Sequence, residues 1–303
     1  MRSQGASLPH SRSKGIILVL IAALFWGVSG TVAQYLFHQQ GFSAEWLVDI
    51  RLLFSGVILL LFAYTVKKQN IWSIWKNKRD ILALILFGIF GMLGVQYTYF
   101  IAILYGNAAS ATVLQYLAPV FITCFLCIQA KKFPAKYEIF AVLLALIGTF
   151  LLVTNGNIQT LSISKPAFFW GILSAFALAF YTLQPGGLLS KWGSLLIVGW
   201  GMLIGGIGFS FISPPWKFQG HWSVPSLFAV LFVVIFGTLI AFFCYLESTK
   251  YIRASETSLL ACAEPLSAAF LAVVWLHVPF GLGEWIGTLC IILTIFLLSA
   301  VKQ

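Results

Sequence analysis

Charged residues are scarce in this sequence, and acidic residues are the scarcest. Only 9% of the 303 residues are charged, and 8 acidic residues stand against 18 basic ones. Soluble globular domains carry about 25% charged residues. Because 60% of the residues are hydrophobic and the mean hydropathy is +0.97, the composition excludes an ordinary soluble protein and predicts a polytopic membrane protein.

Histidine and cysteine are also rare, which argues against several kinds of site. The chain has four histidines and five cysteines. No two of His38, His221 and His277 have the spacing of metal ligands. All five cysteines fall within apolar stretches, so we interpret Cys124-x-x-Cys127 as helix packing and not as a redox pair. We therefore expect no metal site and no cofactor.

The sequence contains many long apolar runs. They are about 18 to 23 residues long, enough for a helix to cross a ~30 Å hydrocarbon core, and short polar breaks separate them. The pattern predicts an all-α integral membrane protein with ten transmembrane helices. The expected spans are about 15–35, 46–66, 81–103, 107–129, 137–154, 166–186, 195–213, 226–247, 255–276 and 284–301. The remaining residues are too scattered to form an appended catalytic domain.

The net charge of +10 is best understood from the segments that carry the bases. If the amino terminus is inside, 15 of the 18 bases fall in inner segments, whereas Lys165 and Lys217 fall in outer loops and Arg51 near the start of the second span. This bias predicts a multi-pass protein of the cytoplasmic membrane with both termini in the cytoplasm and residues 1–14 as a cytoplasmic segment. The bases orient the chain in the lipid bilayer, and no nucleic-acid partner is expected.

The chain also repeats itself. An offset of 146 residues aligns Gly91 with Gly237 and Pro119 with Pro265, and an offset of 156 aligns the first spans of the two copies. The difference of ten residues fits the longer basic loop of the first copy. The sequence therefore predicts two copies of a five-helix unit.

The number of helices in each unit sets how the two copies are related. The predicted units are residues 15–155 and 166–301. Because five is odd, the second unit enters the membrane from the opposite side, and the copies form an inverted repeat. Such repeats are typical of alternating-access transporters, whose substrate binds near mid-membrane between the halves. Interrupted helices at equivalent positions, here at Pro119 and Pro265, are the best sequence indication of that site.

Glu264 is the acidic residue expected nearest the middle of the membrane. It follows Arg253 by 11 residues, roughly 16 Å along a helix and about half of the hydrocarbon core. A central acidic residue costs about 2.5 to 3.5 kcal/mol, so it should face a water-filled path or a partner. Pro265 breaks the helix beside it. Ala118 is its counterpart in the first copy, so only one copy supplies this candidate for proton coupling. The alternative is a protonated structural carboxyl group.

Other polar and aromatic residues complete a candidate substrate cavity. Gln96 and Tyr99 lie three apart on one helix face, and Gln115 lies one turn before Pro119. The alternative for these amides is hydrogen bonding between helices, and for Trp26 it is ordinary packing. The predicted cavity contains Trp26, Gln96, Tyr99, Gln115, Tyr181, Tyr245 and Glu264.

Asp49 and Arg51 lie near the outer end of the second span. They are two residues apart, do not share a helix face and need not pair with each other. Two interpretations stay open at this point: a solvated pair at the membrane interface, or a gate on the outer vestibule.

These features resemble a known family, the EamA-type transporters of the drug/metabolite transporter superfamily. The resemblance rests on Leu24-Phe-Trp26, the tyrosine-rich end of span three, the proline of span four and Ala263-Glu-Pro265. It implies an exporter of amino acids, metabolites or small toxic compounds, with a cavity lined mainly by spans one, three, four, six, eight and nine. Members often carry an acidic residue in a turn after spans four and nine. Here Lys132 and Val278 stand at those positions, so its role does not carry over.

The sequence thus predicts a secondary transporter, not an enzyme, that exports a small-molecule substrate by alternating access. Proton coupling and uncoupled facilitation both stay open, as does the oligomeric state. One alternative is a membrane-embedded enzyme, which needs a nucleophile and a base within reach of each other. Five of the acids are instead dispersed at helix ends, with no histidine nearby in the sequence: Asp80, Glu138, Glu247, Glu256 and Glu284. The other alternative is a receptor or scaffold that does not transport.

Overall fold

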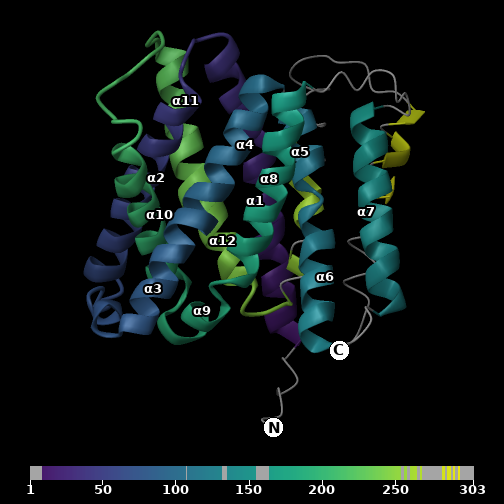
Figure 1. The fold of residues 1–303 in the computed structure, drawn as a ribbon, viewed down its shortest axis with the longest axis horizontal. Helices are drawn as coiled ribbons and strands as arrows, with labels where there is room; N and C mark the ends of the chain where they lie inside the picture. The colour runs from purple at the N-terminus through teal and green to yellow at the C-terminus, as the bar shows by residue number, and fades with distance from the viewer. Residues whose placement is uncertain are drawn as a thin grey trace.

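The computed structural model is an all-helical bundle, as the sequence predicts (Figure 1). It describes residues 9–106, 108–131, 135–154, 164–253, 256–257, 260–264, 267, 282–283, 285–287, 289–290 and 293. Within these residues, five helices are long and apolar enough to cross a membrane: Arg12–His38, Ala44–Thr65, Lys78–Tyr105, Lys165–Trp192 and Val224–Ser248. Most of the last two expected spans, with Pro265 and Val278, lies outside the described residues, as does Lys132. The count of ten spans therefore stays a prediction.

The first half of the chain contains α1 to α7. Its helices are α1 (Pro9–His38), α2 (Ala44–Thr65), α3 (Lys78–Leu86), η2 (Phe87–Leu93), α4 (Gly94–Tyr105), α5 (Ala108–Gln115), α6 (Ala118–Ala130) and α7 (Lys136–Thr154), with a short turn η1 (Ser73–Lys76) before α3. Side-chain caps set two of the starts: Ser43 accepts a hydrogen bond from the Trp46 amide, and Asn77 accepts one from the Arg79 amide. Such caps satisfy backbone donors that have no partner within the helix.

The second half contains α8 to η5. Its helices are α8 (Lys165–Leu183), α9 (Gly186–Trp192), α10 (Ser194–Ser210), α11 (Val224–Val234), η4 (Ile235–Ile240), α12 (Ala241–Ser248) and η5 (Ala261–Ala263). Ser164 caps α8 and Ser223 caps α11, and a proline follows in the first turn of each. Proline is favourable there because its missing N–H would have no helical partner.

The fourth expected span is broken where the sequence indicates. α5 ends at Gln115 and α6 begins at Ala118, so the break covers Tyr116 and Leu117. Pro119 lies in the first turn of α6, where it opens the second segment without removing a helical hydrogen bond. Within the break, the Tyr116 amide still donates to the Thr112 carbonyl oxygen at 3.0 Å and the Leu117 amide to that of Leu114 at 3.2 Å.

Two π-helical segments occur at equivalent places in the two halves. Phe87–Leu93 interrupts the third span, Ile235–Ile240 interrupts the eighth, and Gly91 and Gly237 lie within them, 146 residues apart. π turns are rare and often mark functional positions. The same irregularity at matched positions supports duplicated halves.

The helices pack mainly across the two halves. The most extensive contacts join α2 with α10, α4 with α8, and α1 with α12. In the predicted repeat, the first span (α1) corresponds to the sixth (α8), and the third span (α4) corresponds to the eighth (α12). The contact of α1 with α12 is then equivalent to the contact of α8 with α4. Small residues permit these helices to approach closely. A Cβ atom on Gly56 of α2 would lie 2.7 Å from the Leu203 backbone nitrogen of α10. A Cβ atom on Gly205 of α10 would lie 2.8 Å from the Gly88 carbonyl oxygen of η2.

Candidate functional site

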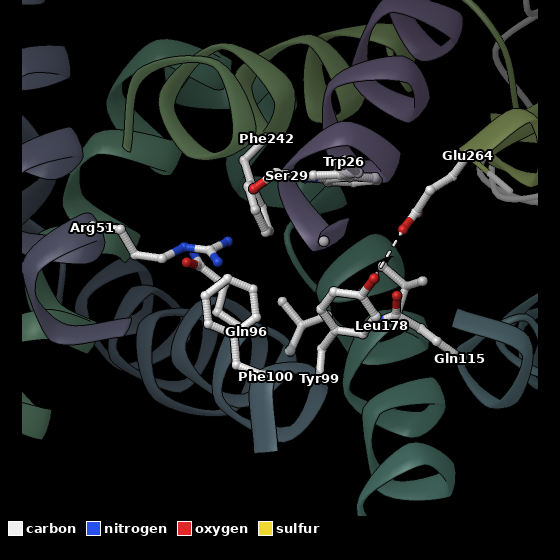
Figure 2. A pocket seen from close by; sticks show the side chains of 12 residues that line it. Trp26, Ser29, Arg51, Gln96, Tyr99, Phe100, Gln115, Leu178, Phe242 and Glu264 are labelled. Atoms are coloured by element: carbon white, nitrogen blue, oxygen red, sulfur yellow. Dashed lines mark hydrogen bonds between the residues drawn. The ribbon is translucent and has the colours of Figure 1, made fainter. Parts of the chain in front are cut away.

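A small cavity lies at the contact between the two halves (Figure 2). Side chains from both halves line it: Trp26, Ser29 and Gly30 of α1, Arg51 of α2, Val95, Gln96, Tyr99 and Phe100 of α4, Gln115 of α5, Leu178 of α8, Phe242 of α12, and Glu264. Its volume is about 30 Å³, room for about two water molecules. A metabolite could enter only after the helices move apart.

The structure brings together five of the seven residues that the sequence analysis singled out. Trp26, Gln96, Tyr99, Gln115 and Glu264 line the cavity. Tyr181 and Tyr245 do not line it and are fully buried behind its wall. Tyr181 donates a hydrogen bond to the Phe242 carbonyl oxygen at 3.1 Å, and the Tyr245 ring centroid lies 5.0 Å from that of Trp26. These two tyrosines therefore support lining residues instead of facing a ligand.

Glu264 is held by two tyrosines from the other half of the chain. The Tyr99 hydroxyl oxygen lies 3.3 Å from Oε1 and 2.9 Å from Thr112 Oγ1. The Tyr116 hydroxyl oxygen lies 3.3 Å from Oε2 and 2.9 Å from the Ala261 carbonyl oxygen. Each hydroxyl has one proton, which it can donate to Glu264 or to its nearer neighbour. The Glu264 side chain is buried, as expected for an acid that avoids lipid. Its carboxyl group thus joins α4 and the break between α5 and α6 to the second half.

Tyr116 is a site residue that the sequence analysis missed. It stands in the two-residue break that separates α5 from α6, and its hydroxyl group reaches Glu264 from there. Its position three residues before Pro119 was the available signal, because a residue beside an interrupted helix is well placed to face a site.

Asp49 and Arg51 correct one expectation. Both are buried, with exposed fractions of 0% and 3%, so the solvated interfacial interpretation is wrong. They do not pair with each other: the Asp49 carboxylate oxygens both lie 3.1 Å from Ser210 Oγ, which donates to them, whereas Arg51 lines the cavity. Their different environments follow from their spacing, since residues two apart on a helix point in different directions.

The Arg51 guanidinium lies between two aromatic rings at one end of the cavity. Its central carbon is 4.2 Å from the ring centroid of Phe100 and 5.8 Å from that of Phe242. The ring faces attract the cation. Its Nε and Nη1 atoms are buried without a hydrogen-bond partner. The Nε1 atom of Trp26 and the Oε1 atom of Gln96 are also buried without a hydrogen-bond partner. Four unpaired polar atoms therefore belong to residues that line this cavity.

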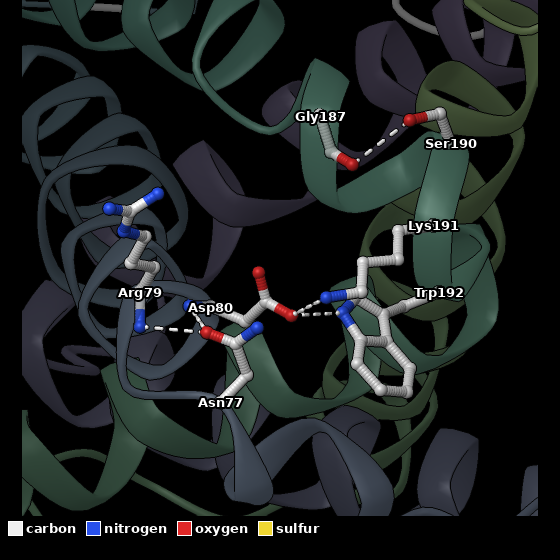
Figure 3. A network of polar contacts seen from close by, with 7 residues as sticks. All are labelled: Asn77, Arg79, Asp80, Gly187, Ser190, Lys191 and Trp192. Carbon is white, nitrogen blue, oxygen red and sulfur yellow. Dashed lines mark hydrogen bonds and ion pairs between the residues drawn. The ribbon is translucent and has the colours of Figure 1, made fainter.

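Polar contacts between the halves also lie at the end of the bundle where α3 and α9 meet (Figure 1). Asp80 of α3 pairs with Lys191 of α9 and accepts a hydrogen bond from Trp192 Nε1 at 3.0 Å (Figure 3). α1 begins at the same end (Figure 1), and there Arg12 pairs with Glu256 at 2.7 Å. Each pair joins a residue of the first half to one of the second.

A larger groove of about 1140 Å³ runs between α6, α8 and α4. It is lined mainly by apolar side chains, and several are exposed, including Phe90, Phe125 and Phe176. Apolar side chains that face outward from a membrane bundle contact lipid tails. We therefore place the candidate site in the small polar cavity.

The sequence pattern of the EamA-like transporter family matches residues 13–154 and again residues 165–300. An uncharacterized inner membrane transporter of Salmonella typhimurium, YicL, is 43% identical over 95% of this chain and 96% of its own length. An uncharacterized transporter of Bacillus subtilis, YyaM, is 23% identical over 94% of this chain and 93% of its own. A solved crystal structure with 17% identity has a TM-score of 0.77 and covers 96% of this chain and 99% of that chain, a likeness of fold.

Proposed function

Because this chain belongs to the EamA-like transporter family, we propose that it is a secondary transporter of the inner membrane that exports a small molecule by alternating access. Family membership removes the membrane-enzyme alternative. The observation that carries the proposal is the cavity itself: its lining comes from both halves and contains a buried acid and a buried base. Buried ionisable groups in membrane segments usually mark a transport path.

The arrangement of the halves supports an inverted repeat that rocks about this cavity. The matched π segments and the cross-half helix pairs are what two equivalent units of opposite orientation would produce. In such transporters one unit moves against the other around a fixed site. The small volume of the cavity fits a closed conformation between two open ones.

The ion pairs that join the halves at one end would act as a gate. Opening the cavity towards that end separates Asp80 from Lys191 and Arg12 from Glu256. Lys191 is 48% exposed, and a pair with an exposed partner contributes only about 0 to 1 kcal/mol. The Arg12–Glu256 pair is mostly buried, with side-chain exposures of 17% and 5%, and breaking a buried pair costs more. The Asp80–Lys191 pair would therefore close the gate weakly, and the Arg12–Glu256 pair would hold it more firmly.

Glu264 is the proposed proton-coupling residue. Its carboxylate oxygens lie 3.3 Å from the hydroxyl oxygens of Tyr99 and Tyr116 in the closed conformation. When the halves separate, these contacts break, because the tyrosines belong to the first half and Glu264 to the second. The carboxyl group would then exchange a proton with water on the open side.

Two experiments test the proposal. The first compares extracellular metabolites of cells with and without the protein, and a compound that accumulates outside only when the protein is present identifies an export substrate. The second measures counterflow of that labelled compound in proteoliposomes. A carrier that alternates its access exchanges labelled for unlabelled substrate, whereas a receptor or scaffold gives no counterflow.

Glu264→Gln separates coupling from transport. We expect uptake driven by a pH gradient to fall to background while counterflow persists, since glutamine keeps the shape of the side chain but cannot exchange a proton. Glu247→Gln is the matched control, because Glu247 pairs with Lys250 within the second half of the chain and does not line the cavity. Unchanged pH-driven uptake in Glu264→Gln would remove Glu264 from the coupling step.

A further inference from the structure

We propose that Arg51 is the anion-binding residue of the central cavity, and that the transported molecule carries a carboxylate group. This inference rests on the proposed transport function and names the chemical class of its substrate. It depends on four observations: the depth of Arg51, its missing hydrogen-bond partners, the position of the acids, and the other unpaired atoms around the cavity.

The first observation is the depth of the charge. Arg51 lies seven residues after Ala44, the first residue of α2, which places it roughly 10 Å along the helix. The helix is one of the candidate membrane spans, and the Arg51 side chain is buried inside the bundle. It therefore does not extend to the membrane surface, as arginines near helix ends commonly do. An arginine buried at this depth is costly and usually functional.

The second observation is the set of groups that the guanidinium contacts. Phe100 and Phe242 cover its faces, and aromatic rings offer no acceptor in the guanidinium plane. Nε and Nη1, which lie in that plane, are left without partners. Nε–H and Nη1 lie on opposite sides of the guanidinium, because Nη1 is cis to Cδ, so they are two separate charged donors without an acceptor. A carboxylate oxygen forms a charge-assisted hydrogen bond with either donor.

The third observation is that the acids close to Arg51 are engaged elsewhere. No ion pair joins Arg51 to another described residue. Asp49 accepts from Ser210. Figure 2 shows Glu264 at the other end of the cavity, in contact with Tyr99, and Tyr116 is its second tyrosine neighbour. The positive charge is thus unmatched within the described part of the protein, and an anionic ligand group would match it.

The fourth observation is the composition of the space between Arg51 and Glu264. Trp26 Nε1 is an unpaired donor and Gln96 Oε1 an unpaired acceptor, and both residues line the cavity. A molecule with its carboxylate at Arg51 would extend past these atoms towards Glu264. A molecule with only a positive charge would be repelled by Arg51.

A thermal-unfolding experiment on the purified full-length protein in detergent tests the inference. The probes are three small molecules of similar size: sodium propionate, alanine and propylammonium chloride, compared at equal ionic strength. A ligand that binds only the folded protein raises Tm in proportion to the logarithm of its concentration. We expect Tm to rise with propionate and alanine and to stay constant with propylammonium. A rise with alanine alone also supports the carboxylate and indicates a zwitterion.

Three variants test whether the rise in Tm depends on Arg51. Arg51→Gln should abolish the rise with either carboxylate, and Arg51→Lys should reduce it because lysine keeps the charge but lacks the planar guanidinium with its fixed donor directions. Arg79→Gln is the matched control: Arg79 lies in the exposed first turn of α3, and the rise should be unchanged. Without ligand, Arg51→Gln should unfold at the same or a higher temperature than the wild type, because an unmatched buried charge is removed.

Several results would overturn the inference. They are a wild-type Tm that no carboxylate raises, an equal rise with propylammonium, or a rise that survives in Arg51→Gln. A lower Tm of unliganded Arg51→Gln with the propionate effect intact would assign Arg51 to packing. If Arg51→Gln does not fold, Arg51→Lys decides, and an undiminished rise there overturns the inference.

The unfolding experiment and the counterflow assay together keep this inference separate from the proposed transport function. Arg51-dependent binding in a protein without counterflow would reject the transport function and leave the anion site. Counterflow of a substrate that has no anionic group would support transport and reject the anion site.

Discussion

Tyr99 and Glu264 belong to opposite halves of the chain, and the Tyr99 hydroxyl oxygen lies 3.3 Å from Oε1 of Glu264. Figure 2 shows this contact at the wall of the cavity. Because the two residues are 165 positions apart in the sequence, the contact exists only when the halves are packed together. In the proposed transport cycle, separation of the halves breaks this contact.

Tyr99→Phe should destabilise the closed protein. The substitution removes the hydroxyl group that lies 2.9 Å from Thr112 Oγ1 and 3.3 Å from Glu264 Oε1, and leaving a buried acceptor unsatisfied costs about 1 to 3 kcal/mol. Tyr97→Phe is the control, since the Tyr97 ring packs against Trp170 and Phe209 and these contacts remain. Thermal unfolding measures the stability of both variants, and equal Tm values for Tyr99→Phe and Tyr97→Phe would contradict the prediction.

Gly237→Ala should disturb the contact between η4 and α1. A Cβ atom at Gly237 would lie 2.1 Å from Ser29 Oγ and 2.4 Å from Ser29 Cβ, so the helices must separate, at about 1 to 3 kcal/mol. Gly186→Ala is the control, because nothing lies within 4 Å of the added atom. Unfolding temperatures compare the two variants.

The double variant Ser29→Gly with Gly237→Ala tests the cause of that destabilisation. It removes both clashing atoms of Ser29, and the next atom is Ser29 Cα at 3.7 Å, an ordinary contact. We expect most of the lost stability to return. A double variant as unstable as Gly237→Ala would show that steric overlap with Ser29 is not the cause.

Asp80→Asn should open the cavity towards the end of the bundle at which α1 begins. It weakens the pair with Lys191, worth at most about 1 kcal/mol, or roughly a fivefold change in the open population. The measurement is the labelling rate of a cysteine placed at Leu178, a lining residue, in a background without the native cysteines. Glu247→Gln is the control because its partner Lys250 lies three residues away in the same half. Equal labelling rates in both variants would reject the gate.

The proposed inverted repeat predicts where the two chain ends lie. With five helices in each half, both ends should be in the cytoplasm, on the side that holds most of the basic loops. Reporter fusions or impermeant thiol labelling at residues near each end measure this directly. Ends on opposite sides of the membrane would rule out two complete five-helix units.

Some features of the site could be predicted from the sequence because they depend on local properties. The break before Pro119 follows from the covalent structure of proline. The shared face of Gln96 and Tyr99 follows from helical periodicity. Both residues line the cavity, and periodicity was enough to place them together.

Other features could not be predicted in this way. Tyr181 and Tyr245 have the same polar tips as Tyr99, yet they lie behind the wall. In a helix that is apolar all round, the pattern of hydrophobic residues does not distinguish the face towards the core from the face towards lipid. Which tyrosine faces the cavity therefore depends on the rotation of each helix against its neighbours.

The sequence by itself determined that the chain is helical and membrane-embedded, because within lipid every backbone hydrogen bond must be made inside the segment and long apolar runs can do so only as helices. It also determined the internal duplication, which the matched π segments around Gly91 and Gly237 reflect. Only the tertiary structure decided that Arg51 is buried at the cavity, between Phe100 and Phe242. The rings that cover it come from distant segments, and no local pattern around Arg51 records their approach.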